Sequence, residues 1–226
     1  MKNLQDCQET IHRTTGSWPL KAIEHRPEHP TSLILLLHGY NERGLRIFRK
    51  LKRSLPAQAH VIAPNGIFPL PRVKPDRLDF GYSWYFFDKF TQSYEVDQSL
   101  CVEALKDLLQ KLNPENLPVT LIGFSQGGYL APLLAYACPN VKHVIGIGCE
   151  FKARFFQTPP TFTLAGIHGS ADPLVSCAHA HAEVEALKTK GIMVDWHVIS
   201  ELKHEITTEV SSLVSQLLEQ YGTAGL

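Results

Sequence analysis

Short apolar and β-branched runs alternate with longer amphipathic stretches along the chain. The runs predict strands at 32–37, 60–63, 119–123, 143–148, 161–167 and 193–199. Several of them are apolar at every position, as expected of strands that are buried on both faces of a sheet. The alternation is typical of crossover units that feed a mostly parallel sheet.

The amphipathic stretches between the runs predict helices. The ranges are 45–55, 92–112, 126–137, 179–190 and 205–221. The clearest is 92–112, where apolar residues recur at three- and four-residue spacing and leave charged residues for water. The chain contains no internal repeat and no linker. We therefore expect a single α/β domain over 1–226, with helices on both faces of the sheet.

One segment, 64–90, does not follow this alternation. It is rich in proline and aromatic residues and has no clean period of two or of 3.6. Connections of this length with little regular structure are unusual in a compact domain and are often functional. We expect an irregular, aromatic-rich segment, either as a binding element or as a surface loop packed on the core.

Composition and charge limit the possible functions. The chain has 226 residues, a formal net charge of zero and an isoelectric point near 7.2. No excess of basic residues is available to attract a phosphate backbone, so we do not expect nucleic-acid binding. The longest strongly apolar run, 33–37, is far shorter than the ~20 residues needed to cross a bilayer. A small uncharged substrate is therefore favoured.

The N-terminus and the cysteines indicate the compartment. Residues 1–7 are polar and lack the apolar core of a secretory signal. The five cysteines are odd in number and form no C-x-x-C pair, which favours reduced thiols over disulfides or a cysteine-rich zinc site. Cys177, His179 and His181 have a spacing that metal ligands can have, but no further cluster accompanies them. We expect a cytoplasmic protein without a bound metal.

The strongest chemical motif is Gly123-Phe124-Ser125-Gln126-Gly127, which fits the pattern G-x-S-x-G. It lies between a predicted strand and a predicted helix, where this pattern describes a sharp turn that exposes the serine hydroxyl. The glycines allow so tight a turn, and the helix N-terminus supplies N–H groups for an oxyanion. Ser125 is thus a candidate nucleophile.

A serine nucleophile needs a base, and the base needs an acid to fix its tautomer. In this kind of fold the chain order is serine, acid, histidine. Asp172 follows the predicted strand 161–167, and His204 follows the predicted strand 193–199. All three residues then lie at the carboxyl edge of one sheet. Glu201 is the nearest rival acid, and His168 is expected to hydrogen-bond within its own turn.

An oxyanion hole needs a second N–H from the loop after an early strand. The sequence Leu37-His38-Gly39-Tyr40-Asn41 follows the most apolar strand. We expect the backbone N–H groups of Tyr40 and Gln126 to be the two donors to the oxyanion.

Taken together, these motifs resemble the α/β-hydrolase family of carboxylesterases, lysophospholipases and acyl-protein thioesterases. The resemblance runs from about 32 to 218 and rests on LHGYNERG, GFSQGG, HGSADPLV and KHEI, in that order. It implies Ser125 as nucleophile, Asp172 as acid and His204 as base, with Tyr40 and Gln126 as oxyanion donors. A family glycine is replaced by Asn41, which tolerates left-handed backbone.

The resemblance also implies an activity. We expect hydrolysis of a small-molecule or lipid-like ester or thioester through an acyl-enzyme, without metal or organic cofactor. The aromatic segment is expected to contact the acyl chain, with Trp84 and Phe68 as substrate-binding residues. Two alternatives stay open, an inactive binding protein with this fold and a triad hydrolase that cleaves another bond such as a peptide. The sequence makes no prediction of oligomeric state.

Overall fold

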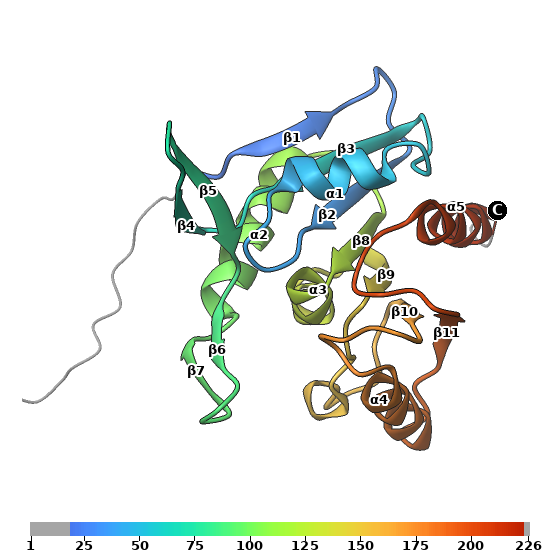
Figure 1. The fold of residues 1–226 in the computed structure, drawn as a ribbon. Helices are drawn as coiled ribbons and strands as arrows, with labels where there is room; N and C mark the ends of the chain where they lie inside the picture. The colour runs from blue at the N-terminus through green and yellow to red at the C-terminus, as the bar shows by residue number, and fades with distance from the viewer. Residues whose placement is uncertain (1–18, 224–226) are drawn as a thin grey trace, which may run out of the picture.

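A computed structural model describes residues 19–223, and a seven-stranded sheet organises them (Figure 1). The strand order is β1-β3-β2-β8-β9-β10-β11. All neighbouring pairs are parallel except β1 with β3. The bounds are β1 Ala22–His25, β2 Ser32–Leu37, β3 Ala59–Pro64, β8 Val119–Phe124, β9 Val141–Ile147, β10 Thr163–Gly169 and β11 Val194–Ile199.

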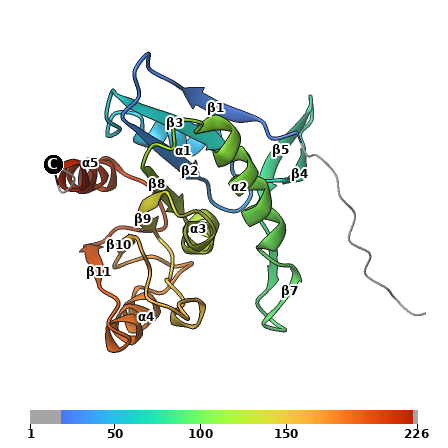
Figure 2. The same ribbon diagram turned by 180° about the vertical axis from the view of Figure 1, so that it is seen from behind.

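Helices cover both faces of this sheet, as Figures 1 and 2 show. One face carries α1 and α5, and the other carries α2, α3 and α4. The helices are α1 Gly44–Leu51, α2 Ser99–Leu112, α3 Gln126–Ala137, α4 Cys177–Thr189 and α5 Thr208–Thr223, with a 3₁₀ turn at Ala153–Phe155. No helix in the described part of the chain is long and apolar enough to cross a membrane.

Strand β2 shows why the sheet has two cores. Leu33, Leu35 and Leu37 pack under α2 and α3, whereas Ile34 and Leu36 pack under α1 and α5. Successive side chains of a strand point to opposite faces, so a strand covered on both sides must be apolar throughout. All five of these side chains are at most 1% exposed.

The segment 64–90 is not irregular, so that prediction was wrong. Most of it forms two hairpins that project from one side of the molecule (Figure 1). The first pairs β4, Phe68–Val73, with β5, Leu78–Ser83, and the second pairs β6, Phe86–Asp88, with β7, Ser93–Val96. The prolines of β4 hid its alternation of half-buried and exposed residues. A two-stranded ribbon has open edges, where proline is tolerated.

The predicted helix at 92–112 also begins later than expected. Residues 93–96 belong to β7, and α2 starts at Ser99. The short edge strand β1 was not predicted, because Ala22–His25 is mostly exposed and lacks an apolar run. The other predicted strands and helices are present with shifts of a few residues at their ends. Asn41 adopts a φ of 59°, which confirms the expected left-handed backbone.

Candidate active site

The carboxyl ends of neighbouring strands bring the predicted triad together. Ser125 follows β8 directly, Asp172 lies in the loop after β10, and His204 lies in the loop after β11. These strands run parallel in one sheet, so their ends share an edge. Residues separated by 79 and 32 positions along the chain are thereby placed within hydrogen-bond distance.

Ser125 occupies a strained turn between β8 and α3. Its φ of 50° and ψ of −119° lie outside the regions that most residues with a side chain adopt. Glycines on both sides make the turn possible: a Cβ on Gly123 would lie 2.4 Å from the carbonyl oxygen of Gly127. Hydrogen bonds hold the turn, with the N–H of Ser125 donating to the carbonyl of Ile147 at 2.8 Å. The backbone thus presents the hydroxyl toward His204.

The hydrogen bonds of His204 fix its tautomer. Nδ1–H donates to Oδ2 of Asp172 at 2.7 Å, because a carboxylate can only accept. Nε2 is then free to accept from the Ser125 hydroxyl, whose Oγ lies 2.9 Å away. This arrangement matches the geometry that a histidine needs to take a proton from serine.

Asp172 is held as a carboxylate by its surroundings. Burial favours the neutral acid and acts to raise its pKa, since the side chain is 1% exposed. Hydrogen bonds from Val175 N–H, His204 and Leu174 N–H outweigh burial and leave the pKa of Asp172 below its ordinary value. Asp172 is therefore ionised at neutral pH and able to stabilise an imidazolium.

The imidazole of His204 is also fixed by packing. Its ring lies 4.9 Å from the ring of Phe124, and a Cβ on Gly148 would come within 3.3 Å of it. Gly148 has a φ of 57°, a conformation that glycine adopts without steric cost. These contacts restrict the ring to a plane that keeps both of its hydrogen bonds.

The loop that carries Tyr40 is anchored by the buried side chain of His38. Its Nδ1–H donates to the Gly39 carbonyl at 2.7 Å, and its Nε2 accepts from the N–H of Gly66 at 2.8 Å. The indole N–H of Trp84 donates to the His38 carbonyl at 2.8 Å. Within the described residues the N–H of Tyr40 has no hydrogen-bond partner, and the N–H of Gln126, the first residue of α3, has none within its helix.

His38 makes stability depend on pH. Burial lowers its pKa from 6.5 to about 4, the hydrogen bond to Gly39 opposing this only in part. Between about pH 6.5 and pH 4 the unfolded chain binds a proton that the folded chain does not. As the pH is lowered through this window, we expect the free energy of unfolding to fall by up to roughly 3 kcal/mol. The variant His38→Gln should show a weaker dependence of the free energy of unfolding on pH. Urea unfolding followed by circular dichroism at several pH values measures it.

The control for this prediction removes an exposed histidine. The side chain of His181 is 56% exposed, so His181→Gln should keep the wild-type dependence on pH. An equal slope in His38→Gln and the wild type would show that another group is responsible.

The side chain of Gln126 has a structural role that the sequence did not reveal. Its Oε1 accepts from the N–H of Trp84 at 3.0 Å, and its Nε2 donates to the carbonyl of Tyr85 at 2.8 Å. Ser83 Oγ lies 3.2 Å from the same Oε1. Gln126 therefore ties the turn around Ser125 to the chain between the two hairpins. A buried amide with a complete set of partners specifies one arrangement of these segments.

The predicted substrate-binding residues lie in different surroundings. Trp84 is 0% exposed and packs against the ring of His38 at 4.8 Å, so its ring supports the loop that carries Tyr40 from inside the core and offers no surface to a ligand. The prediction of a ligand contact through Trp84 is therefore not supported by its position. Phe68 is half-buried at the start of β4 and packs against Phe86 at 5.3 Å.

Two of the competing side chains have other roles. Nε2–H of His168 donates to the carbonyl of Val175 at 2.9 Å, which confirms the expected hydrogen bond within its turn. Glu201 is exposed and, among the described residues, makes no hydrogen bond or ion pair with His204, whereas Asp172 does. In residues 19–223 no group of three or more histidine, cysteine or acidic residues is placed to hold a metal ion.

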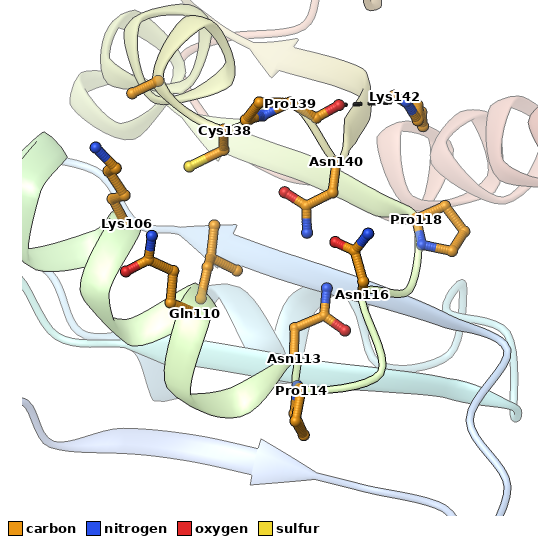
Figure 3. Close-up of a pocket in the computed structure, with 12 residues that line it drawn as sticks. Lys106, Gln110, Asn113, Pro114, Asn116, Pro118, Cys138, Pro139, Asn140 and Lys142 are labelled. Atoms are coloured by element: carbon orange, nitrogen blue, oxygen red, sulfur yellow. Dashed lines mark hydrogen bonds between the residues drawn. The ribbon is translucent and has the colours of Figure 1, made fainter.

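Two of the hollows in the described part of the chain lie at opposite ends of the sheet. A narrow one of about 60 Å³ is lined by His204 and Phe124. A larger one of about 590 Å³ lies between the ends of α2 and α3, where the amides of Asn113, Asn116 and Asn140 gather (Figure 3). The larger hollow adjoins the amino ends of β8 and β9 and contains no triad residue, so it is separate from the candidate active site.

Comparison with known proteins places this geometry in context. The chain matches the phospholipase/carboxylesterase family over residues 19–220. It is 34% identical to Esterase YpfH of Escherichia coli K12, over 81% of each chain. It is 29% identical to Lysophospholipase-like protein 1 of Mus musculus, over 88% of this chain and 91% of the mouse protein.

Solved structures agree on the fold. Esterase PE8 superposes with a TM-score of 0.67 at 23% identity, over 90% of this chain and 98% of its own. Acyl-protein thioesterase 2 of Zea mays superposes with a TM-score of 0.66 at 20% identity, over 90% of this chain and 99% of the maize chain. The expected α/β-hydrolase fold is thereby confirmed. With the family matched over most of its length, the chain belongs to the phospholipase/carboxylesterase family of hydrolases.

Proposed function

We propose that this protein hydrolyses carboxylic esters or thioesters through an acyl-serine intermediate formed on Ser125. The observation that carries the proposal is the line of hydrogen bonds from Asp172 through His204 to Ser125, at 2.7 and 2.9 Å. Family membership supports the same reaction class. The proposal assigns nucleophile, base and acid to these residues of this chain.

The first half of the reaction forms the acyl-enzyme. Ser125 Oγ attacks the carbonyl carbon while its proton moves to Nε2 of His204, and Asp172 stabilises the imidazolium. The carbonyl oxygen gains negative charge and accepts hydrogen bonds from the backbone N–H groups of Tyr40 and Gln126. The C–O or C–S bond then breaks, and the leaving group takes its proton from His204.

Water completes the cycle by the same chemistry. His204 removes a proton from a water molecule as the water attacks the acyl carbon, and the two N–H groups again hold the oxyanion. The bond to Ser125 Oγ then breaks, and Oγ takes the proton back from His204. The carboxylic acid departs, and the resting hydrogen bonds re-form. Each step uses only groups that the described chain supplies, so the proposal includes no metal and no organic cofactor. A small-molecule or lipid-like acyl compound is the proposed substrate, and we retain a cytoplasmic location because the described cysteines are free thiols.

An activity-based probe tests the assignment of the nucleophile. We expect a fluorophosphonate to label the wild-type protein covalently and stoichiometrically, and Ser125→Ala to take up no label, because only a serine activated by a base reacts at neutral pH. Intact-protein mass spectrometry measures the adduct.

The matched control replaces an exposed serine on α5. Ser212→Ala should label as the wild type does, since Ser212 is exposed on α5 and makes no hydrogen bond with a histidine among the described residues. A wild-type protein that stays unlabelled would indicate a binding protein with a hydrolase fold instead of an enzyme.

A further inference from the structure

The loop that carries the proposed acid spans 170–176 and leads from β10 to α4. Backbone hydrogen bonds tie its beginning to the chain around β11. The N–H of Ser170 donates to the carbonyl of Ile199, the last residue of β11, at 2.9 Å. The next N–H, that of Ala171, donates to the carbonyl of Leu202 at 3.1 Å. The first half of the loop is therefore fixed to its surroundings by its own backbone.

The second half of the loop, residues 173–175, has no such backbone bonds among the described residues. The N–H groups of Leu174 and Val175 both donate to Oδ1 of Asp172, which belongs to the same loop. Residues 173 and 174 are also exposed, so packing holds them only weakly. Within the part of the chain that the structure describes, His168 is the one group outside the loop that forms a hydrogen bond to this half.

His168 lies one residue before the end of β10, and its side chain reaches across the loop. Its Nε2 is 2.9 Å from the carbonyl oxygen of Val175, and because a carbonyl can only accept, Nε2 carries the proton. The backbone of Val175 is then bound at both polar groups, its N–H by Asp172 and its carbonyl by His168. His168 therefore fixes the residue that in turn binds Oδ1 of Asp172.

The same imidazole also lies beside the other oxygen of the carboxylate. Nε2 of His168 is 3.7 Å from Oδ2 of Asp172, which is too long for a hydrogen bond. Oδ2 is the oxygen that accepts from Nδ1–H of His204 at 2.7 Å. With Oδ1 bound by two N–H groups and the imidazole of His168 next to Oδ2, the carboxylate is restricted to the orientation that faces His204.

Packing holds the ring of His168 in place. The side chain is fully buried, and its ring lies 5.6 Å from that of Trp196 on β11. Trp196 is opposite Gly166 in the register of β10 and β11. A Cβ on Gly166 would lie 2.5 Å from Cε3 of the indole, so the indole lies against the backbone of β10. A side chain locked by packing can hold its hydrogen-bond partner in one position.

We propose that His168 is a positioning residue for the hydrolysis of esters or thioesters. Through the carbonyl of Val175 it keeps the carboxylate of Asp172 aligned with His204. This inference rests on the proposed function, because His168 has this role only if Asp172 is the acid of the triad. A histidine that only stabilises the fold affects the free energy of unfolding. A histidine that positions the acid also affects kcat, because the acid fixes the tautomer and the orientation of the base.

Two amide substitutions at position 168 separate these roles. The side-chain nitrogen of glutamine lies near the place of Nε2, whereas that of asparagine lies near the place of Nδ1 and does not reach Val175. We expect His168→Asn to lower kcat for a p-nitrophenyl ester roughly tenfold, the rate equivalent of one hydrogen bond. KM should stay within about twofold of wild type, because the buried side chain does not contact substrate. His168→Gln should keep kcat within about threefold of wild type.

The matched control is another buried histidine. His60 lies near the amino end of β3, at the edge of the sheet opposite to the triad, and Nε2 lies 2.7 Å from Oε1 of Glu24. In both His60 and His168, Nδ1 has no hydrogen-bond partner among the described residues. His60→Asn removes a comparable group from the core, and we expect kcat to stay within about twofold of wild type. Circular dichroism verifies that each variant is folded.

A double variant tests whether His168 acts through Asp172. In the Asp172→Asn background the alignment of a carboxylate no longer contributes, so the addition of His168→Asn should lower kcat by less than about twofold. A further loss of roughly tenfold in the double variant would show a route that bypasses Asp172 and would overturn the inference.

The single variants can also overturn it. A kcat for His168→Asn equal to that of wild type, an equal loss in His168→Gln, or an equal loss in His60→Asn each contradicts a positioning role. Failure of the proposed function gives a different result. A wild-type protein that neither hydrolyses the ester nor takes up a fluorophosphonate overturns both proposals, whereas an active wild type with an unaltered His168→Asn overturns only this one.

Discussion

Asp172→Asn is expected to lower kcat for an ester by about 10⁴-fold while leaving the fold intact. The reason lies in how the carboxylate is held. Oδ1 accepts the N–H groups of Leu174 at 2.8 Å and of Val175 at 2.9 Å, so an asparagine must keep its carbonyl oxygen there. Its NH₂ group then faces Nδ1 of His204 and donates to it. That nitrogen becomes an acceptor, and the proton moves to Nε2, which can no longer take a proton from Ser125.

Steady-state kinetics on a p-nitrophenyl ester, with circular dichroism to verify folding, measures this effect. The control is Asp195→Asn, which alters another aspartate paired with a histidine, His197, at 2.9 Å on the edge strand β11. We expect the control to retain kcat within about twofold. A kcat for Asp172→Asn close to wild type would exclude Asp172 as the acid of the triad.

Gly127→Ala is expected to reduce the free energy of unfolding by about 3 kcal/mol or more. A Cβ at this position would lie 2.2 Å from the carbonyl oxygen of Leu37, where α3 packs against β2. The two nearest atoms, the carbonyl oxygen and carbon of Leu37, belong to the backbone, so the helix itself must move away from the sheet. The better helix propensity of alanine, about 1 kcal/mol, does not offset this displacement. The movement also shifts the turn that carries Ser125, so we expect catalytic activity to fall together with stability.

Chemical denaturation in urea measures the change. Gly222→Ala is the matched control, because its Cβ would meet no atom within 4 Å near the end of α5. The control should alter the free energy of unfolding by less than about 1 kcal/mol. If Gly127→Ala unfolds at the wild-type urea concentration, the packing of α3 on β2 is looser than described.

The sequence was sufficient to predict the candidate triad, for a physical reason. Ser125, Asp172 and His204 each follow an apolar strand, and the carboxyl ends of parallel strands meet at one edge. Strand identification alone therefore placed the three residues together. Their roles in catalysis, and the oxyanion roles of Tyr40 and Gln126, stay predictions until the variants are measured. The single domain over 1–226 also stays a prediction, and residues 1–18 and 224–226 lie outside the described part.

The hairpins were not predictable in the same way. Strand β4 alternates half-buried and exposed residues, but two prolines interrupt its apolar pattern, and β5 shows no such alternation. The bonds of the Gln126 amide to Trp84 and Tyr85 join segments more than 40 residues apart, and no local pattern signals such a contact. Trp84 looked like a ligand-binding aromatic because its motif was aromatic. Trp84 is buried and belongs to the core, and the periodicity of the sequence around it did not show this burial.

The position of β11 at the margin of the sheet has a consequence for how the molecule loses activity on heating. Strand β11 pairs only with β10, whereas β8 is held between two neighbours. Marginal strands detach at lower free-energy cost than central ones. His204 follows the weakly held strand and Ser125 the firmly held one, so we expect fraying at this margin to separate the proposed base from the proposed nucleophile first. On heating, we therefore expect activity to be lost before the rest of the molecule melts.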